Sequence, residues 1–144
     1  MLRRRAKSLG SDAKIQLLRD VPLFAQCSKR ELGQLALVTD EVDVDPETVL
    51  ITEGDRGREF FVLVEGAADV RRKGRRINTM GPGDFFGEIA LLADRPRTAT
   101  VTTTAPTHLL VLTDRAFRRL LKELPSIQLK VLTALAERLP AEAF

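Results

Sequence analysis

The chain has 144 residues and carries 23 lysines and arginines against 20 aspartates and glutamates, so its formal net charge is +3 at pH 7. This length suits one domain with one hydrophobic core, and the single cysteine, Cys27, excludes an internal disulfide. Because no apolar run is long enough to span a bilayer or to resemble a secretory leader, we expect a cytoplasmic protein with no transmembrane segment in this chain.

The first part of the chain, residues 1–40, is predicted to be a helical lead-in. Ser11 or Asp12 can cap a first helix, and Ser28 with Glu31 three residues later forms the capping-box pattern that begins a second. The basic run that precedes these helices is interpreted as a flexible arm at the terminus.

From residue 41 the pattern changes to that of strands. Val42 and Val44 alternate with acids, and Phe60–Val64 is an unbroken apolar run. Turn signals built from glycine, proline and aspartate recur between such runs. Residues 41–113 are therefore predicted to form a small antiparallel β-barrel or jelly roll, which makes the chain mainly β with flanking helices.

The closing part, residues 114–144, is predicted to hold two helices. Thr113 or Asp114 can cap the first, whose apolar stripe begins at Phe117, and Pro125 interrupts the pattern before a second apolar face. A proline between two helices suits a hinge.

One stretch, Phe85–Val101, combines an acid, free backbone amides and an arginine. Gly87 allows a close approach to a ligand, and Glu88–Leu92 can begin a short helix whose first amide hydrogens lack helical partners. Arg97 leaves a stiff turn behind a proline and can pair with phosphate oxygens, while the glutamate can accept hydrogen bonds from ribose hydroxyls. This combination favours a sugar phosphate as ligand.

The same stretch, Phe85–Val101, closely resembles the phosphate-binding cassette of cyclic-nucleotide-binding domains, found in the catabolite activator protein, the regulatory subunits of cyclic-AMP-dependent protein kinase and nucleotide-gated channels. A second stretch, Gly54–Val70, matches the family's signature of a strand, a glycine and a strand. The resemblance covers nearly the whole chain. It implies one cyclic nucleotide-binding domain, in which a cupin-like, double-stranded β-helix lies between N-terminal helices and two C-terminal hinge and lid helices.

The resemblance also implies roles for single residues. Glu88 would accept the ribose 2′-hydroxyl, Arg97 would pair with the cyclic phosphate, and backbone amides of the cassette would add phosphate contacts. The last helix would fold over the base as a lid. The expected binding residues are Gly87, Glu88, Ile89, Ala90, Arg97, Thr98, Ala99, Leu132 and Leu135, with Leu139 as a further lid candidate.

The implied function is a regulatory sensor that transmits nucleotide occupancy by moving its C-terminal helices. We expect cyclic AMP as ligand and keep cyclic GMP as the other candidate, because Thr98 occurs in family members of either preference. The chain has no tryptophan or tyrosine, so aliphatic contacts are expected to hold the base. No metal or other cofactor is expected.

The effector is expected to be a separate partner protein or an attached domain. No DNA-binding, kinase or pore segment follows the last helix, so the chain would be a free-standing sensor or a domain of a longer protein. The sequence leaves open whether the terminal helices form a homodimer.

Other functions are weaker. An enzyme is disfavoured because His108 stands alone where a cupin metal centre uses several histidines, and no nucleophile and base constellation is visible. A scaffold with a vacant site is the main alternative, and the intact cassette argues against it. A nucleic-acid binder would use the basic runs Arg3–Arg5 and Arg71–Arg76, but the second run is interpreted as a solvated hairpin tip. Cys27 is interpreted as a packing residue.

Overall fold

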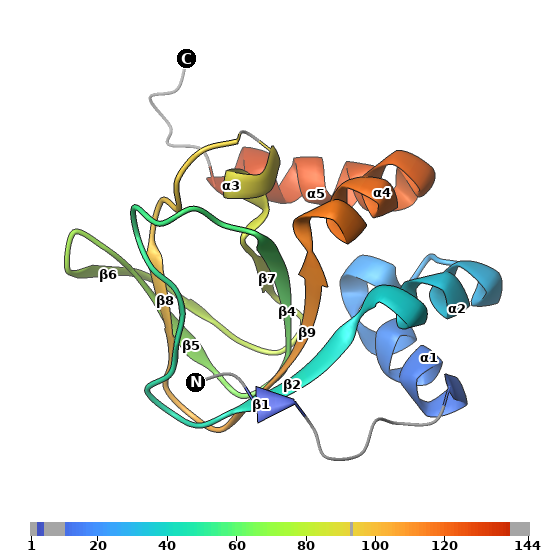
Figure 1. Cartoon of the computed structure of the whole chain (residues 1–144), viewed down its shortest axis with the longest axis horizontal. Helices are drawn as coiled ribbons and strands as arrows, with labels where there is room; N and C mark the ends of the chain where they lie inside the picture. The colour runs from blue at the N-terminus through green and yellow to red at the C-terminus, as the bar shows by residue number, and fades with distance from the viewer. Residues whose placement is uncertain (1–2, 5–10, 93, 139–144) are drawn as a thin grey trace.

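The computed structural model describes residues 3–4, 11–92 and 94–138. In these residues, two antiparallel sheets face each other and the helices gather against one of them (Figure 1). The strands are β1 (Arg3–Arg4), β2 (Asp40–Val44), β3 (Val49–Ile51), β4 (Glu59–Glu65), β5 (Ala68–Arg72), β6 (Arg75–Met80), β7 (Phe85–Phe86), β8 (Thr100–Thr103) and β9 (Thr107–Thr113). The first sheet has the order β1-β2-β9-β4-β7, and the second has the order β3-β8-β5-β6.

The space between the sheets is filled by one face of each sheet. On β4, Phe61 and Leu63 belong to this inner cluster, whereas Phe60 and Val62 belong to a second cluster shared with the helices. Both faces of β4 are therefore covered, which explains why Phe60–Val64 is apolar throughout. The prediction of a mainly β, jelly-roll fold with flanking helices is confirmed.

The predicted barrel differs in one respect, because the strands of the described residues do not close into a single cylinder. The last strand, β9, pairs with β2 and β4 inside its own sheet. The register of β4 against β9 shifts between Leu63 and Glu65, and that of β5 against β6 shifts between Val70 and Arg71. Such irregularities bend strands, so the two sheets pack face to face instead of joining edge to edge.

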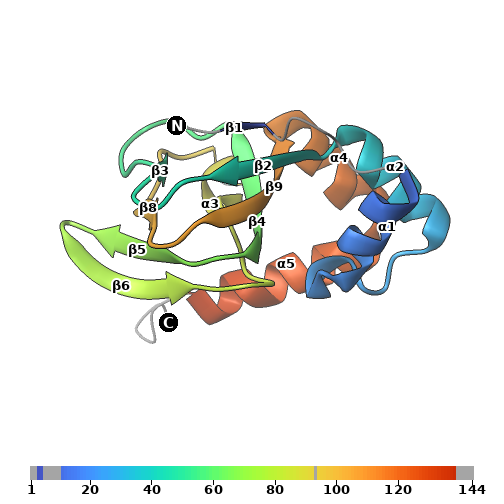
Figure 2. The same ribbon diagram turned by 90° about the horizontal axis from the view of Figure 1, so that it is seen from below.

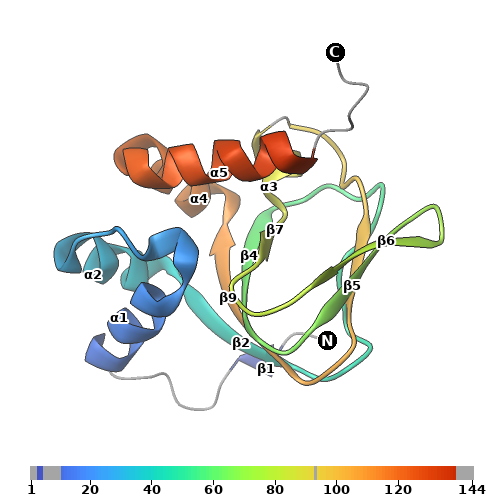
Figure 3. The ribbon, with the colours of Figure 1, turned by 180° about the vertical axis from the view of Figure 1, so that it is seen from behind.

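The longer helices cover the outer face and one end of the five-stranded sheet (Figure 3). Figure 2 shows α5 running from this helical end back toward the β5–β6 hairpin. Within the described residues, no helix is both long and apolar enough to cross a membrane. The helices are α1 (Ser11–Asp20), α2 (Lys29–Val38), α3 (Glu88–Leu92), α4 (Asp114–Glu123) and α5 (Pro125–Arg138), with a 3-10 turn at Pro22–Phe24.

The capping box predicted for α2 is present. Ser28 N donates to Glu31 Oε1 over 2.7 Å, and Glu31 N donates to Ser28 Oγ over 3.1 Å. Cys27 lies just before this cap and is buried, and burial raises the pKa of its thiol. Its surroundings therefore favour the packing role expected from the sequence.

The two closing helices meet at a proline, as predicted. Thr113 Oγ1 accepts a hydrogen bond from Ala116 N over 3.2 Å and caps α4. Pro125 is the first residue of α5, where a missing amide hydrogen costs no helical hydrogen bond. Ile127 and Val131 then attach α5 to the apolar cluster of the helices.

The prediction of a flexible N-terminal arm is wrong for Arg3 and Arg4. They form β1, which pairs with β2 so that Arg3 lies opposite Asp43. Pairing covers an edge whose backbone groups would otherwise have no strand partner. Arg5 and Lys7, the other cations of this run, lie outside the described residues.

The second basic run forms the tip of the β5–β6 hairpin, as predicted. Lys73 and Gly74 make the turn with φ values of 52° and 77°, and the residues around them are exposed.

Candidate functional site

The predicted cassette folds as β7, a glycine turn, α3 and the loop that precedes β8. β7 pairs with β4, which ties the start of the cassette to the five-stranded sheet. Gly87 has a φ of 98°, a conformation that favours glycine. A Cβ at this position would lie 2.9 Å from Nη1 of Arg97 and 2.9 Å from the carbonyl oxygen of Glu59. The turn therefore needs glycine for both its backbone angle and its close contact with the arginine.

Arg97 lies in a narrow slot and is only 5% exposed. Its Nη1 donates to the carbonyl oxygen of Gly87 over 2.9 Å, and its Nη2 donates to that of Glu59 over 2.8 Å. Gly57 forms the opposite wall, because a Cβ there would overlap the guanidinium carbon. Burial lowers the pKa of Arg97, and the charges of Glu59 and Glu88 oppose that shift. An arginine remains a cation under these conditions.

The role of Gly57 was not predicted from the sequence, where this residue is one of several glycines that are interpreted only as turn formers. The two residues are far apart in the chain and meet because Arg56 forms a β-bridge with Pro96. The backbone N of Arg97 also donates to the carbonyl oxygen of Asp55 over 2.7 Å. No local sequence pattern reports such a contact between two loops.

A cavity of about 280 Å³ opens beside the slot. Glu88, which is 0% exposed, lines this cavity together with Arg97. A buried carboxylate can accept hydrogen bonds from hydroxyl groups, and a buried guanidinium can bind an anionic group. The cavity brings together the predicted residues Gly87, Glu88, Arg97, Thr98 and Ala99.

The rest of the cavity wall is largely apolar and includes residues from the inner faces of both sheets. Such a wall suits a flat, weakly polar group. The apolar residues from these inner faces all belong to the inner cluster or pack against it, and alternation along the strands made their inward orientation predictable. These residues are Ile51, Val70, Met80, Phe86, Ala99 and Val101.

Side chains of the β5–β6 hairpin also line the cavity, which the sequence reasoning did not predict. They are Arg72, Ile77 and Asn78. Nε of Arg72 donates to the carbonyl oxygen of Thr98 over 3.0 Å, so the hairpin contacts the cassette directly. The sequence carries one signal for this contact, because Ile77 is an apolar residue among charged and polar neighbours on β6 and it stays 48% exposed there.

Two cassette residues are placed only by their backbone. Ile89 and Ala90 lie within α3, directly after Glu88. Their side chains fall outside the described part of the structure, so the predicted phosphate contacts of their amides stay predictions.

The structure places one of the predicted lid residues, Leu132, away from the cavity. Leu132 is 60% exposed and does not line it, whereas Glu137 from the last turn of α5 does. The reason is helical geometry, because the buried Val131 sets which face of α5 points inward and Leu132 is turned about 100° away from it. Leu135 also lies in α5, but its side chain is not among those that the structure describes. Leu139 lies outside the described residues, so both stay predictions as lid residues.

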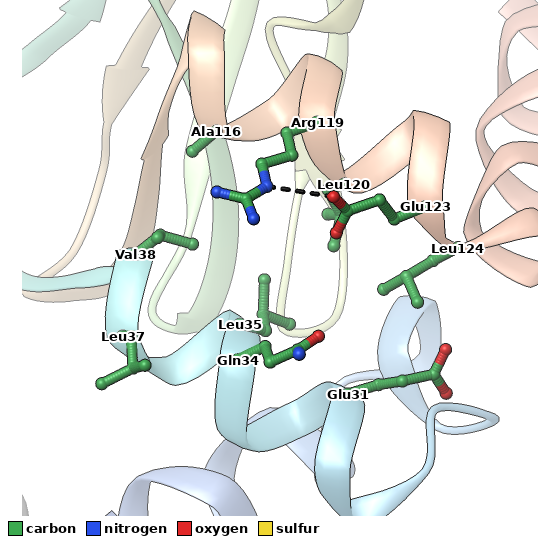
Figure 4. Close-up of a pocket in the computed structure, with 10 residues that line it drawn as sticks. All are labelled: Glu31, Gln34, Leu35, Leu37, Val38, Ala116, Arg119, Leu120, Glu123 and Leu124. Atoms are coloured by element: carbon green, nitrogen blue, oxygen red, sulfur yellow. Dashed lines mark hydrogen bonds and ion pairs between the residues drawn. The ribbon is translucent and has the colours of Figure 1, made fainter.

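A separate groove between α2 and α4 has a different character (Figure 4). Its floor is built from leucines of the two helices, including Leu35 and Leu120. Arg119, the only cation among its lining residues, already forms an ion pair with Glu123 at 3.0 Å. The groove therefore lies between α2 and α4, and none of its described lining residues offers an unpaired cation to a phosphate.

His108 belongs to a buried polar cluster on the five-stranded sheet. Its Nδ1 lies 2.8 Å from Oδ1 of Asp43, and its Nε2 lies 3.7 Å from Oε1 of Glu41. In the described ranges, no group of three or more histidine, cysteine, aspartate and glutamate side chains is arranged to hold a metal ion. The cluster links β2 to β9.

Comparisons with known proteins point to one family. The family model described as the cyclic nucleotide-binding domain matches residues 41–124. The cAMP-dependent protein kinase regulatory subunit of Yarrowia lipolytica is 39% identical over 106 residues, which are 72% of this chain and 28% of that protein. The chain thus spans less than a third of the length of this relative.

Solved structures agree with the family model. The cAMP-bound protein PfPKA-R superposes with a TM-score of 0.73 at 27% identity, over 88% of this chain and 47% of the other. The catabolite activator protein of Thermus thermophilus superposes with a TM-score of 0.72 at 25% identity, over 81% of this chain and 57% of the other. Both structures share the fold of this chain over the residues that superpose.

Proposed function

Because the chain belongs to the cyclic nucleotide-binding domain family, we propose that it is a sensor module that binds cyclic AMP in the cavity beside Arg97. The observation that carries this proposal is the buried guanidinium of Arg97 next to the buried carboxylate of Glu88. A cation taken out of water needs paired or hydrogen-bonded neighbours, and a phosphate is an anion that matches a guanidinium in shape.

In this proposal the cyclic phosphate binds to Arg97. Two backbone carbonyls already hold the guanidinium in one orientation. A guanidinium has five N–H donors, so donors remain for the phosphate oxygens. Because the side chain is ordered before the ligand arrives, binding loses less conformational entropy. The amides of Ile89 and Ala90 would add further donors.

The sugar and the base take the remaining surfaces. Glu88 accepts the 2′-hydroxyl of the ribose, a contact in which a charged acceptor makes a stronger hydrogen bond than a neutral one. The base lies against the apolar wall around Val70 and Met80. Arg72 and Asn78 offer polar groups beside this wall and would discriminate cyclic AMP from cyclic GMP.

The relatives support cyclic AMP as the ligand. The Yarrowia lipolytica protein is named a cAMP-dependent protein kinase regulatory subunit, and the PfPKA-R structure is described as cAMP-bound. We carry the ligand class over to this chain and extend it to a regulatory role, in which an effector protein or an attached effector domain responds to occupancy.

Occupancy would be transmitted by the C-terminal helices. Glu137 brings the last turn of α5 to the cavity, and α5 turns away from α4 at Pro125. A ligand can shift the position of α5 only if it contacts that helix differently in two states. In this scheme residues 1–40 are the lead-in, 41–113 hold the ligand, and 114–144 act as hinge and lid.

The proposal is tested by calorimetric titration of the protein with cyclic AMP, cyclic GMP and linear 5′-AMP. We expect saturable binding of cyclic AMP with one site per chain, weaker binding of cyclic GMP, and the weakest binding of the linear nucleotide. The Arg97→Lys variant should bind cyclic AMP more weakly, because lysine cannot reproduce the forked contact. The matched Arg119→Lys variant, altered in the α2–α4 groove, should bind like the parent.

No heat with either cyclic nucleotide, from protein that melts cooperatively, would overturn the sensor function. It would favour the scaffold with a vacant site. If the parent and Arg97→Lys bind cyclic AMP equally well, the cyclic phosphate does not bind at Arg97.

A further inference from the structure

A second cleft is lined in part by residues of the cassette. Its volume is about 640 Å³, and none of its lining residues lines the nucleotide cavity. Its walls come from the β3–β4 loop, the end of α3, the cassette loop and the start of α4. We call it the arginine cleft after its four cations, Arg56, Arg58, Arg95 and Arg118.

The arginine cleft has more positive than negative charge. Its two carboxylates are already used, because Asp94 lies 3.3 Å from Nη1 of Arg56 and Asp114 lies 3.6 Å from Nη1 of Arg118. Among the residues that the structure describes, the side chains of Arg58 and Arg95 have no such partner. Two guanidinium groups are therefore available at one concave place.

The cleft also has an apolar part. Leu92 lines it and is 42% exposed, beside the fully packed Leu91. The side chain of Asp94 is 85% exposed at the same rim, where it would repel the phosphates of a nucleic acid. A partner with separated carboxylates and an apolar side chain between them matches this pattern better than a uniform polyanion does.

From this charge and shape we propose that the arginine cleft docks an acidic segment of a partner protein. The segment carries at least two carboxylates, which pair with Arg58 and Arg95, and one apolar side chain, which covers Leu92. Guanidinium groups suit this role because they bind carboxylates through two parallel hydrogen bonds. The docking itself does not depend on the function of the nucleotide cavity.

The position of the cleft gives the docking a regulatory consequence, which rests on the proposed function. Gly57 lines the cleft on one side and contacts Arg97 on the other. Nη2 of Arg118 donates to the carbonyl oxygen of Leu91 over 3.0 Å, which ties α4 to the end of α3. In this proposal a change in the cassette moves the walls of the cleft, and nucleotide and peptide then change each other's affinity by the same factor.

The probe is a fluorescein-labelled peptide of sequence EELEEL, followed by anisotropy at low and moderate salt, with the uncharged peptide QQLQQL as its match. We expect EELEEL to bind and QQLQQL to bind at least about tenfold more weakly. The double variant Arg58→Glu with Arg95→Glu should lose at least about tenfold in affinity for EELEEL. Its matched control, Arg75→Glu with Arg76→Glu, makes the same charge change on the exposed hairpin and should lose less than about threefold.

Equal losses in the two double variants would overturn the proposal, because they would show attraction to net charge alone. Equal binding of both peptides would also overturn it. A duplex DNA that displaces EELEEL with a steeper salt dependence would assign the cleft to nucleic acid instead. Melting curves establish that both double variants remain folded.

A final arm repeats the EELEEL titration with cyclic AMP at saturation. We expect a change in peptide affinity of at least about threefold. If calorimetry detects no cyclic AMP binding, the proposed function fails while the peptide result stands. If cyclic AMP binds and the peptide affinity is unchanged, the docking stands and its link to the cassette fails.

Discussion

Arg97 lines the nucleotide cavity and Arg56 lines the arginine cleft, and although a β-bridge joins the loops that carry them, their surroundings differ sharply. Arg97 is 5% exposed and is held by two carbonyl oxygens and two glycines. Arg56 has a side chain that is 76% exposed and pairs with Asp94, whose side chain is 85% exposed. A buried, oriented cation selects one small anion in one geometry, whereas exposed cations favour a broader and weaker contact.

The largest effect that this comparison predicts is on Arg97→Ala. Breaking a buried charge pair costs about 3 to 5 kcal/mol, which is a loss of roughly two to four orders of magnitude in cyclic AMP affinity. Calorimetry measures the loss. Arg95→Ala removes an arginine two positions away on the cleft side and should leave the affinity within about twofold. Similar losses of cyclic AMP affinity in both variants would contradict the assignment of Arg97 to the nucleotide site and of Arg95 to a separate cleft.

A second prediction concerns the slot itself. In Gly57→Ala the new Cβ would overlap the guanidinium of Arg97, so we expect at least about a tenfold loss in cyclic AMP affinity. Gly33→Ala is the control, because nothing lies within 4 Å of its new Cβ and alanine favours the helix α2. Unchanged affinity in Gly57→Ala would mean that the guanidinium is free to move.

A smaller effect is expected from Glu88→Gln, which keeps the shape of the side chain and removes its charge. Hydrogen bonds to charged groups contribute about 1.5 to 3 kcal/mol against about 0.5 to 1.5 for neutral ones, so the affinity should fall about tenfold. With 2′-deoxy cyclic AMP, which lacks the hydroxyl that Glu88 binds, the parent and the variant should differ much less in affinity. Equal losses with both nucleotides would place the ribose elsewhere.

The smallest effect concerns pH. The pKa of Cys27 is raised in the folded protein by burial, with Glu31 acting in the same direction and Lys130 against it. The unfolded chain therefore releases this proton at a lower pH than the folded chain. The contribution of the Cys27 thiol to the free energy of unfolding is therefore fully present below its pKa in the unfolded chain, and it is lost as pH rises through its pKa in the folded chain. Denaturant melts of the parent and Cys27→Ala at pH 7 and above pH 9 should converge as pH rises, and parallel curves would contradict this.

Much of the fold and part of the site could be read from the sequence because the signals are local. The cassette residues Glu88 and Arg97 are close in the chain, and the glycine between β7 and α3 marks the turn that they share. Alternation along β4 likewise shows which residues fill the space between the sheets, because side chains of a strand alternate between faces.

The rest could not be read because it depends on contacts between distant segments. Gly57 has ordinary turn neighbours and gains its role only when its loop pairs with the cassette loop. Glu137 reaches the cavity through the rotation of α5, which is set by the packing of Ile127 and Val131. The pairing of β1 with β2 depends on an open sheet edge, and the spacing of apolar residues along the chain does not show where such an edge lies.

The most direct test of the central claim is a crystal structure of the protein saturated with cyclic AMP. We predict one nucleotide in the cavity, with a phosphate oxygen within hydrogen-bond distance of the Arg97 guanidinium and the ribose 2′-hydroxyl at the Glu88 carboxylate. A cavity that is closed by the protein's own side chains at saturating nucleotide, or a nucleotide bound elsewhere, would contradict the account.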